Sequence, residues 1–122
     1  MDYKTIANDG IVEEEIKKSR FICHLKRISR EEEGREYIAQ IKKQHHKDNH
    51  SCSAIIVGDD GQIKRSSDDG EPSGTAGVPM LTVLEKQGLT NVVAVVTRYF
   101  GGIKLGAGGL IRAYSGSVAH AI

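Results

Sequence analysis

The sequence contains few of the residues that cross-link or stiffen a small protein. Its 122 residues include two cysteines, Cys23 and Cys52, two prolines and no tryptophan. Two cysteines do not indicate the disulfide scaffold that is typical of small secreted domains. We therefore expect a protein of a reducing compartment, the cytoplasm, that is stabilised by an ordinary hydrophobic core.

Long hydrophobic runs are also absent. The most apolar stretch, Val92–Val96, is far shorter than the roughly 20 residues that a transmembrane helix requires. The first residues show no basic and apolar pattern of the kind found in secretion signals. With 39% hydrophobic and 27% charged residues, the composition is that of a soluble globular domain. We expect one domain with its own core and no membrane partner.

Acidic residues are missing from one part of the chain. The net charge of +1 excludes a protein that binds nucleic acid through bulk charge alone. Residues 86–122 contain no Asp or Glu, but they contain Lys86, Arg98, Lys104 and Arg112. On a common face these four side chains would form a patch that attracts anions, whereas scattered positions would serve only solubility.

Apolar periodicity and turn residues predict eight elements. Strands are expected over 11–18, 21–28, 53–58, 62–65 and 92–96, and helices over 29–47, over 79–88 and from about 107 onward. This order predicts an α+β fold, a two-layer sandwich in which a mostly antiparallel sheet carries the helices on one face. The unbroken apolar run Val92–Val96 predicts a central strand that is covered on both faces.

A polar, glycine-rich segment over 68–77 is the first candidate site. Three acidic residues, two hydroxyls and three glycines lie within it, a composition that can bind a metal or orient a substrate. Its spacing matches neither a calcium-binding loop nor a nucleophile elbow. The alternative is a structured turn whose Asp and Ser side chains cap backbone N–H groups before the next helix. The candidate residues are Asp69, Gly70, Glu71, Pro72, Ser73 and Thr75.

A second glycine-rich segment, over 101–109, follows the predicted central strand. Glycines allow main-chain N–H groups to approach an anion, and a helix start adds its dipole, so phosphate is the expected guest. The segment matches neither the Walker A nor the Rossmann fingerprint. The alternative is that the glycines only permit a tight strand-to-helix crossing. The candidate anion- or nucleic-acid-binding residues are Arg98, Tyr99, Gly101, Gly102, Lys104, Gly106, Gly108 and Arg112.

A histidine-rich stretch is a weaker candidate, for zinc. It contains His45, His46, His50 and Cys52, and His46 and His50 would lie one helical turn apart. No second pair of ligands with suitable spacing exists, so a solvated helix end is favoured. We predict no metal, no cofactor and no catalytic residue.

Two long motifs resemble the signatures of a known family. Residues 98–114, RYFGGIKLGAGGLIRAY, and residues 69–81, DGEPSGTAGVPML, resemble the two signatures of the IMPACT family. Shorter blocks over 17–22 and 50–54 resemble family blocks in the same order. The resemblance covers essentially the whole chain and is closest to the bacterial YigZ/YvyE branch.

The resemblance implies a single N-terminal IMPACT domain over 1–122, with a fold like that of the second domain of ribosomal protein S5. Bacterial members usually carry a ferredoxin-like domain after this one. The apolar stripe of the last predicted helix also continues to Ile122. We therefore expect the chain to be a fragment that lacks the C-terminal domain.

The resemblance and the charge pattern together predict a noncatalytic, translation-linked regulator. It would bind RNA or the ribosome through a basic, glycine-rich face, with Tyr99 or Phe100 as a stacking surface. One alternative is a phosphate- or nucleotide-handling enzyme that uses the loops 68–71 and 101–109 across a cleft. Another is a protein–protein regulator of translation or of a stress response, with an unknown protein partner and purely architectural glycines.

Overall fold

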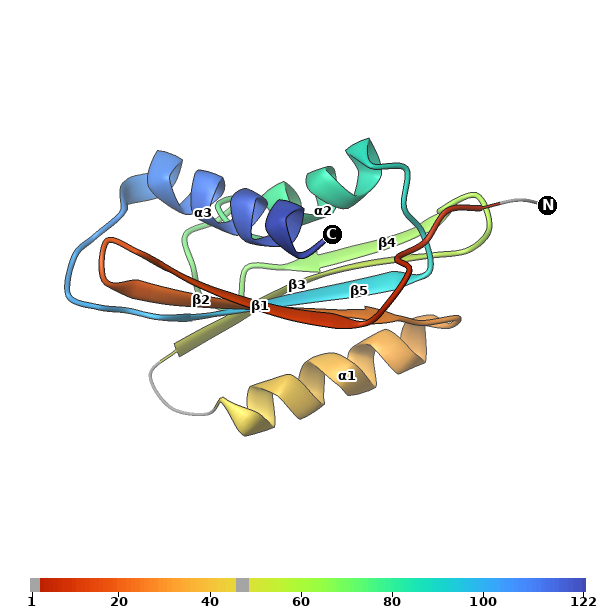
Figure 1. The fold of residues 1–122 in the computed structure, drawn as a ribbon, viewed down its shortest axis with the longest axis horizontal. Coiled ribbons are helices and arrows are strands. Elements are labelled where there is room, and N and C mark those ends of the chain that lie inside the picture. Colours follow the sequence, from red (N-terminus) through yellow and green to blue (C-terminus); the bar gives the residue numbers. More distant parts are fainter. Residues whose placement is uncertain (1–2, 46–48) are drawn as a thin grey trace.

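Five strands and three helices make up the parts of the chain that the structure, a computed structural model, describes: residues 3–45 and 49–122 (Figure 1). The strands are β1 (Gly10–Ile16), β2 (Ser19–Arg27), β3 (Asn49–Val57), β4 (Ile63–Ser67) and β5 (Val92–Tyr99), and the helices are α1 (Glu31–Gln44), α2 (Gly77–Lys86) and α3 (Gly106–Ala121). The elements follow the predicted order, although β3 begins earlier than expected and the end of the predicted helix over 29–47 lies outside the described residues. No helix within these ranges is long and apolar enough to cross a bilayer.

The strands form one sheet with the order β1-β2-β5-β3-β4, and all four neighbouring pairs are antiparallel. β5, the last strand in the sequence, lies between the hairpins β1–β2 and β3–β4. Its Val96 is paired with Cys23 of β2 on one side and with Cys52 of β3 on the other. The predicted α+β class and the antiparallel sheet are therefore confirmed.

The helices cover both faces of the sheet, with α2 and α3 on one face and α1 on the other (Figure 1). They are not confined to one face, as was predicted, and the fold has three layers instead of two. Successive side chains of a strand point to opposite faces. In β5, Ala94 and Val96 therefore join the core under α2 and α3, while Val93 and Val95 join the core under α1. The prediction of a central strand covered on both faces is confirmed.

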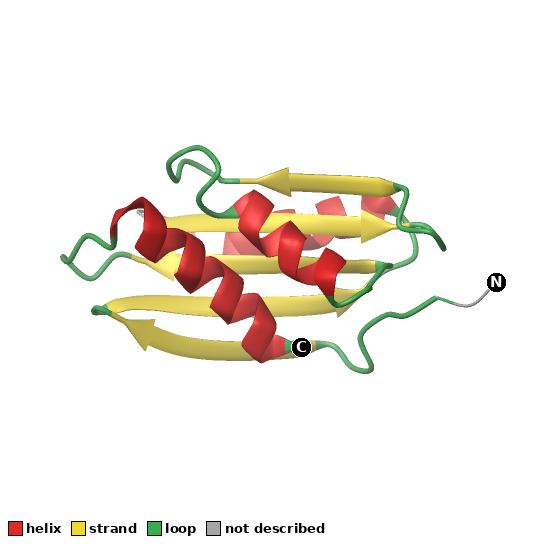
Figure 2. Cartoon of the chain, turned by 90° about the horizontal axis from the view of Figure 1, so that it is seen from above, coloured by secondary structure: helices red, strands yellow, loops and turns green. Residues whose placement is uncertain are grey.

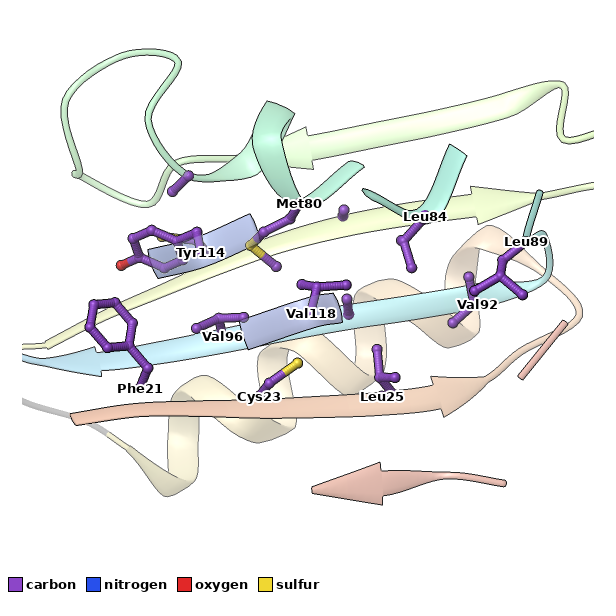
Figure 3. Close-up of a cluster of buried hydrophobic side chains, with 14 of the residues drawn as sticks. Phe21, Cys23, Leu25, Met80, Leu84, Leu89, Val92, Val96, Tyr114 and Val118 are labelled. Atoms are coloured by element: carbon purple, nitrogen blue, oxygen red, sulfur yellow. The ribbon is translucent and has the colours of Figure 1, made fainter. Parts of the chain in front are cut away.

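The larger core lies between the sheet and the pair α2–α3 (Figure 3). Phe21, Met80, Leu84, Tyr114 and Val118 are fully buried there. The rings of Phe21 and Tyr114 meet edge to face with their centroids 5.4 Å apart, a favourable aromatic geometry. This contact anchors the middle of α3 to β2.

The smaller core depends on a close approach of α1 to the sheet. A Cβ atom at Gly34 of α1 would lie only 2.9 Å from Cδ1 of Ile55 on β3. The absence of a side chain at this position therefore allows α1 to pack closely against β3. Ile28 and Ile41 are buried in the same cluster.

Both glycine-rich loops lie at one end of the sheet (Figure 2). The register explains this position, because Tyr99 at the end of β5 pairs with Arg20, just after the β1–β2 turn, and with Asn49 at the start of β3. The loop after β4 emerges at the same end. We refer to residues 17–18, 68–76 and 100–105 together as the motif end.

Candidate nucleic-acid interface

A buried ion pair joins the two signature motifs. The carboxylate of Glu71, in the loop before α2, accepts hydrogen bonds from Nε of Arg98 at 2.6 Å and from Nη2 of Arg98 at 2.7 Å. The hydroxyl group of Tyr114, on α3, donates to the same carboxylate. The side chains of Glu71 and Arg98 are only 2% and 9% exposed. A loop, a strand and a helix are thus held together from inside the fold.

Hydrogen bonds dominate the electrostatics of this cluster. Burial alone would raise the pKa of Glu71, but the bonds from Arg98 and Tyr114 outweigh burial and hold this pKa below its usual value. The bond to Glu71 raises the pKa of Arg98. Burial raises the pKa of the Tyr114 hydroxyl. Glu71 is therefore an anion and Arg98 a cation, and each neutralises the other.

The first loop is a structured cap on α2. Oδ1 of Asp68 accepts hydrogen bonds from the backbone N–H groups of Ala76 at 3.1 Å and Gly77 at 2.8 Å, and its Oδ2 accepts one from Gly74 at 2.9 Å. Burial would raise the pKa of Asp68, but these three bonds lower it overall. The hydroxyl of Thr75 donates to the carbonyl oxygen of Pro72 at 2.6 Å. The capping role that the sequence left open is thus present for Asp68.

Asp69 points away from Asp68 and ties the loop to other elements. Its carboxylate accepts a hydrogen bond from the backbone N–H of Ser51 at 2.8 Å and lies 2.9 Å from Nζ of Lys42 on α1. The next residue, Gly70, has a left-handed backbone with φ of +88° and packs beside the ring of His50. The three acidic side chains of the loop therefore have separate partners and do not converge.

The second loop is shaped by its glycines. Gly101 lies so close to the β1–β2 turn that a Cβ atom would overlap the carbonyl oxygen of Lys18. Gly102 and Gly106 have φ of +94° and +76°, a left-handed backbone that favours glycine. These three glycines have an architectural role, whatever the loop binds.

Positive charge gathers at the start of α3. The first turn of α3 contains no acidic residue, and the exposed Lys104 precedes it. The side chain of Arg112 extends back along the helix, so that its Nη1 atom would be 3.3 Å from a Cβ at Gly108. A helix N-terminus carries partial positive charge, and both cations add to it. This charge is compatible with an anion at this position, and anion binding there stays a prediction.

A cavity of about 320 Å³ lies between the two loops. Its walls include Glu71 and Pro72 from the first motif and Arg98, Phe100, Lys104 and Leu105 from the second. A smaller hollow of about 190 Å³ shares Leu105 and is also lined by Lys17 and Arg112. The two signature motifs and the β1–β2 turn therefore form one continuous surface.

The structure brings most of the predicted residues to this surface, with Tyr99 as the main exception. Tyr99 follows Arg98 in a strand, so its side chain lies on the α1 face. There its hydroxyl lies 2.5 Å from Nδ1 of His45, and the guanidinium of Arg20 covers its ring at 5.3 Å. Of the other predicted residues, Asp69, Gly70 and Thr75 shape the first loop, and Ser73 is exposed on it. The second loop and the start of α3 contain Gly101, Gly102, Gly106 and Gly108.

Some residues of the surface were not predicted. Lys17 is one, although it belongs to the block over 17–22 that resembles the family, and that block was a usable signal. Leu105 and Leu110 also line the cavity, but nothing in the sequence distinguishes them from core leucines. Among the weak zinc candidates, His46 lies outside the described residues, and no group of three or more His, Cys, Asp or Glu side chains converges within residues 3–45 and 49–122.

Comparison with known proteins identifies the family to which this α+β domain with two motif loops belongs. The Impact N-terminal domain family matches residues 17–122, which include the β1–β2 turn and both loops. The chain belongs to this family, and the resemblance of its motifs is confirmed.

Curated relatives are similar over nearly the whole chain. The IMPACT family member YvyE of Bacillus subtilis (strain 168) is 59% identical over 120 residues, which cover 98% of this chain and 55% of the relative. The IMPACT family member YigZ of Escherichia coli (strain K12) is 47% identical over 113 residues, covering 91% of this chain and 55% of the relative. The chain therefore spans about half the length of these relatives.

Solved structures share the fold. A crystal structure described as that of a hypothetical protein has a TM-score of 0.91 and 45% identity, and the match covers 96% of this chain and 58% of the other. The two-domain translational regulator Yih1 has a TM-score of 0.59 and 22% identity, with 98% of this chain and 49% of that chain covered. At that identity, the likeness to Yih1 shows the fold alone.

Proposed function

We propose that this domain binds RNA through the motif end, as a noncatalytic part of a translation-linked regulator. The observation that carries the proposal is a group of exposed cations, at this end and on the adjoining first half of α3, that is not paired with acidic side chains. Lys17, Lys18, Lys104 and Arg112 are exposed, and none of them forms an ion pair within the part of the chain that the structure describes. RNA phosphates are the natural partners of such a group of exposed cations.

The acidic side chains nearby favour binding over catalysis. Asp68 accepts backbone hydrogen bonds, Asp69 is paired with Lys42, and Glu71 is paired with Arg98. A phosphoryl-transfer site would need carboxylates that are free to hold a metal or to accept a proton. Binding is therefore the function that this geometry supports best.

The link to translation comes from the relatives. The chain belongs to the IMPACT family, and the protein Yih1, which shares the fold, is described as a translational regulator. A cationic surface on a domain of such a protein suits ribosomal or messenger RNA. The regulator would be the whole protein, of which this domain supplies the RNA contact.

The test is a salt titration of binding to single-stranded RNA and to ribosomes. A Lys104→Ala/Arg112→Ala variant removes one cation from the motif end and one from the adjoining helix α3, while Lys43→Ala/Lys86→Ala removes the same charge from exposed positions on α1 and α2. Each lost phosphate contact should reduce the slope of log affinity against log salt by about 0.7, so the first variant should lose about 1.4. The second variant should keep the wild-type slope.

Two results would contradict the proposal. An equal loss in both variants would mean that overall charge drives binding and that the motif end has no special part. Absence of binding to RNA and ribosomes at low salt would reject RNA as the ligand and would leave a protein partner as the hypothesis to test.

A further inference from the structure

We infer that the cavity between the two loops is a base-binding pocket, which takes an unpaired base of the RNA whose phosphates lie on the exposed cations. The inference rests on the proposed function and adds to it the form of the RNA, a single strand. Three features of the cavity carry it: its size, its aromatic and apolar wall, and its position among the cations.

The size of the cavity suits one ring system. Its volume of about 320 Å³ is near the lower end of the roughly 300–1,000 Å³ that is typical of small-molecule pockets. A duplex keeps its bases paired and stacked, so they cannot enter it. An unstacked base of a single strand can enter with its sugar outside.

The wall offers a surface for stacking. Phe100 lines the cavity and is 52% exposed, which is unusual for a phenylalanine. The guanidinium carbon of Arg98 lies 5.6 Å from the centre of the Phe100 ring, and Arg98 is itself held by Glu71. One face of the ring therefore has a fixed neighbour. Pro72 and Leu110 add apolar surface to the same cavity.

Exposed cations line the cavity and the hollow beside it. Lys104 lines the cavity itself, and Leu105 separates it from the hollow that contains Lys17 and Arg112. An aromatic surface next to a basic track is the arrangement by which proteins bind single-stranded nucleic acids. An apolar peptide side chain would fill the cavity equally well but would make no use of the three cations.

The test compares three ligands of equal length: a single-stranded RNA of about ten nucleotides, a ribose-phosphate strand without bases, and an RNA duplex. We expect the wild-type chain to bind the RNA strand about tenfold or more tightly than the strand without bases, because base stacking on an aromatic ring has this order of magnitude. The duplex, whose bases are paired, should bind by charge alone, so its affinity should not depend on the wall of the cavity.

Three variants locate the effect. Phe100→Ala removes the stacking ring, and Ala107→Leu places a larger side chain at the exposed start of α3, in the wall of the cavity. Both should abolish the preference for bases. Ile103→Ala is the matched control, because Ile103 is 42% exposed in the same loop and does not line the cavity. Circular dichroism should show that all three variants are folded.

The outcomes separate the inference from the proposed function. If the wild-type chain binds the RNA and the strand without bases equally, the pocket takes no base, although charge-driven binding stands. If the preference persists in both cavity variants, the bases bind elsewhere. If no RNA ligand binds at low salt, both the inference and the proposed function are wrong.

Discussion

Glu71 and Arg98 form a two-bond ion pair inside the fold, with nitrogen–oxygen distances of 2.6 and 2.7 Å. The planar fork of the guanidinium matches the carboxylate and fixes the direction of both side chains. The pair therefore sets the position of the first loop relative to β5. It also leaves direct contact with an external phosphate mainly to exposed cations such as Lys104.

The first prediction concerns this pair. Glu71→Gln leaves the buried cation of Arg98 without an anionic partner, so the free energy of unfolding should fall by about 3–5 kcal/mol. Urea denaturation would measure the change. The control is Glu85→Gln, which breaks the exposed Lys64–Glu85 pair, with side chains 44% and 37% exposed; it should cost no more than about 1 kcal/mol. Similar losses in both variants would show that the buried Glu71–Arg98 pair contributes no more to the free energy of unfolding than an exposed pair does.

The second prediction compares two glycine-to-alanine changes of opposite sign. Gly101→Ala places a methyl group against the carbonyl oxygen of Lys18 and should destabilise the domain by about 1–3 kcal/mol or more. Gly116 lies inside α3, and a methyl group there would meet no atom of another element within 4 Å, so Gly116→Ala should stabilise the domain by about 0.5–1 kcal/mol. Thermal unfolding would give both changes. A neutral Gly101→Ala variant would contradict the close approach of the β1–β2 turn.

The third prediction is a dependence on pH that arises at His24. This side chain is buried on the α1 face beside the ring of His45, and its Nδ1 atom has no hydrogen-bond partner among the described residues. Burial, and to a lesser degree His45, lowers its pKa. The unfolded chain then binds the proton at a higher pH than the folded chain does. Stability is therefore full above about pH 6.5 and falls as the pH decreases through the folded pKa.

A substitution isolates this effect. His24→Phe keeps an aromatic ring but cannot be protonated, so it should lose less stability between pH 7 and pH 5 than the wild type. The contribution of one such group is at most about 1.4 kcal/mol per pH unit. Parallel pH profiles for the His24→Phe variant and the wild type would argue against His24 as the source.

The fourth prediction concerns the two thiols. Cys23 and Cys52 are both fully buried, and burial raises the pKa of each to about 12. Because the thiolate is the reactive form, neither should react quickly with a thiol reagent at pH 8 in the folded domain. Both should react once urea unfolds it. Rapid labelling of either cysteine in the native state would mean that the sheet opens near Val96 far more readily than its packing suggests.

The order of the elements and the fold class were predictable because turns, caps and apolar periods are local signals. The arrangement of the helices was not, although the run Val92–Val96 already implied two covered faces. A central strand that is covered on both faces requires helices on both faces of the sheet. The prediction from this run was therefore correct, and the prediction of helices on one face was wrong. The position of Gly34 against Ile55 shows how α1 comes to cover the second face.

The candidate site was predicted as two motifs, and only the enzyme alternative placed their two loops across a common cleft. The pairing of Glu71 with Arg98 depends on a loop and a strand that only the tertiary fold brings together, so no local pattern shows it. The position of Tyr99 could have been inferred, because neighbours in a strand point to opposite faces and Arg98 and Tyr99 cannot both reach one ligand. The contact of Tyr99 with His45, in contrast, has no signal in the sequence.

The central position of β5 has a consequence for how the domain is made. β2 and β3 are synthesised early, but their shared neighbour β5 begins only at Val92. Neither strand can complete its pairing until β5 has been made. A nascent chain that ends before this point holds two hairpins with open inner edges, which are templates for pairing with other chains. Closure of the sheet requires contacts between distant parts of the sequence, which slows folding. Emergence of the second motif from the ribosome would therefore complete the sheet and the motif end together, and a stalled or shortened chain would be prone to aggregate.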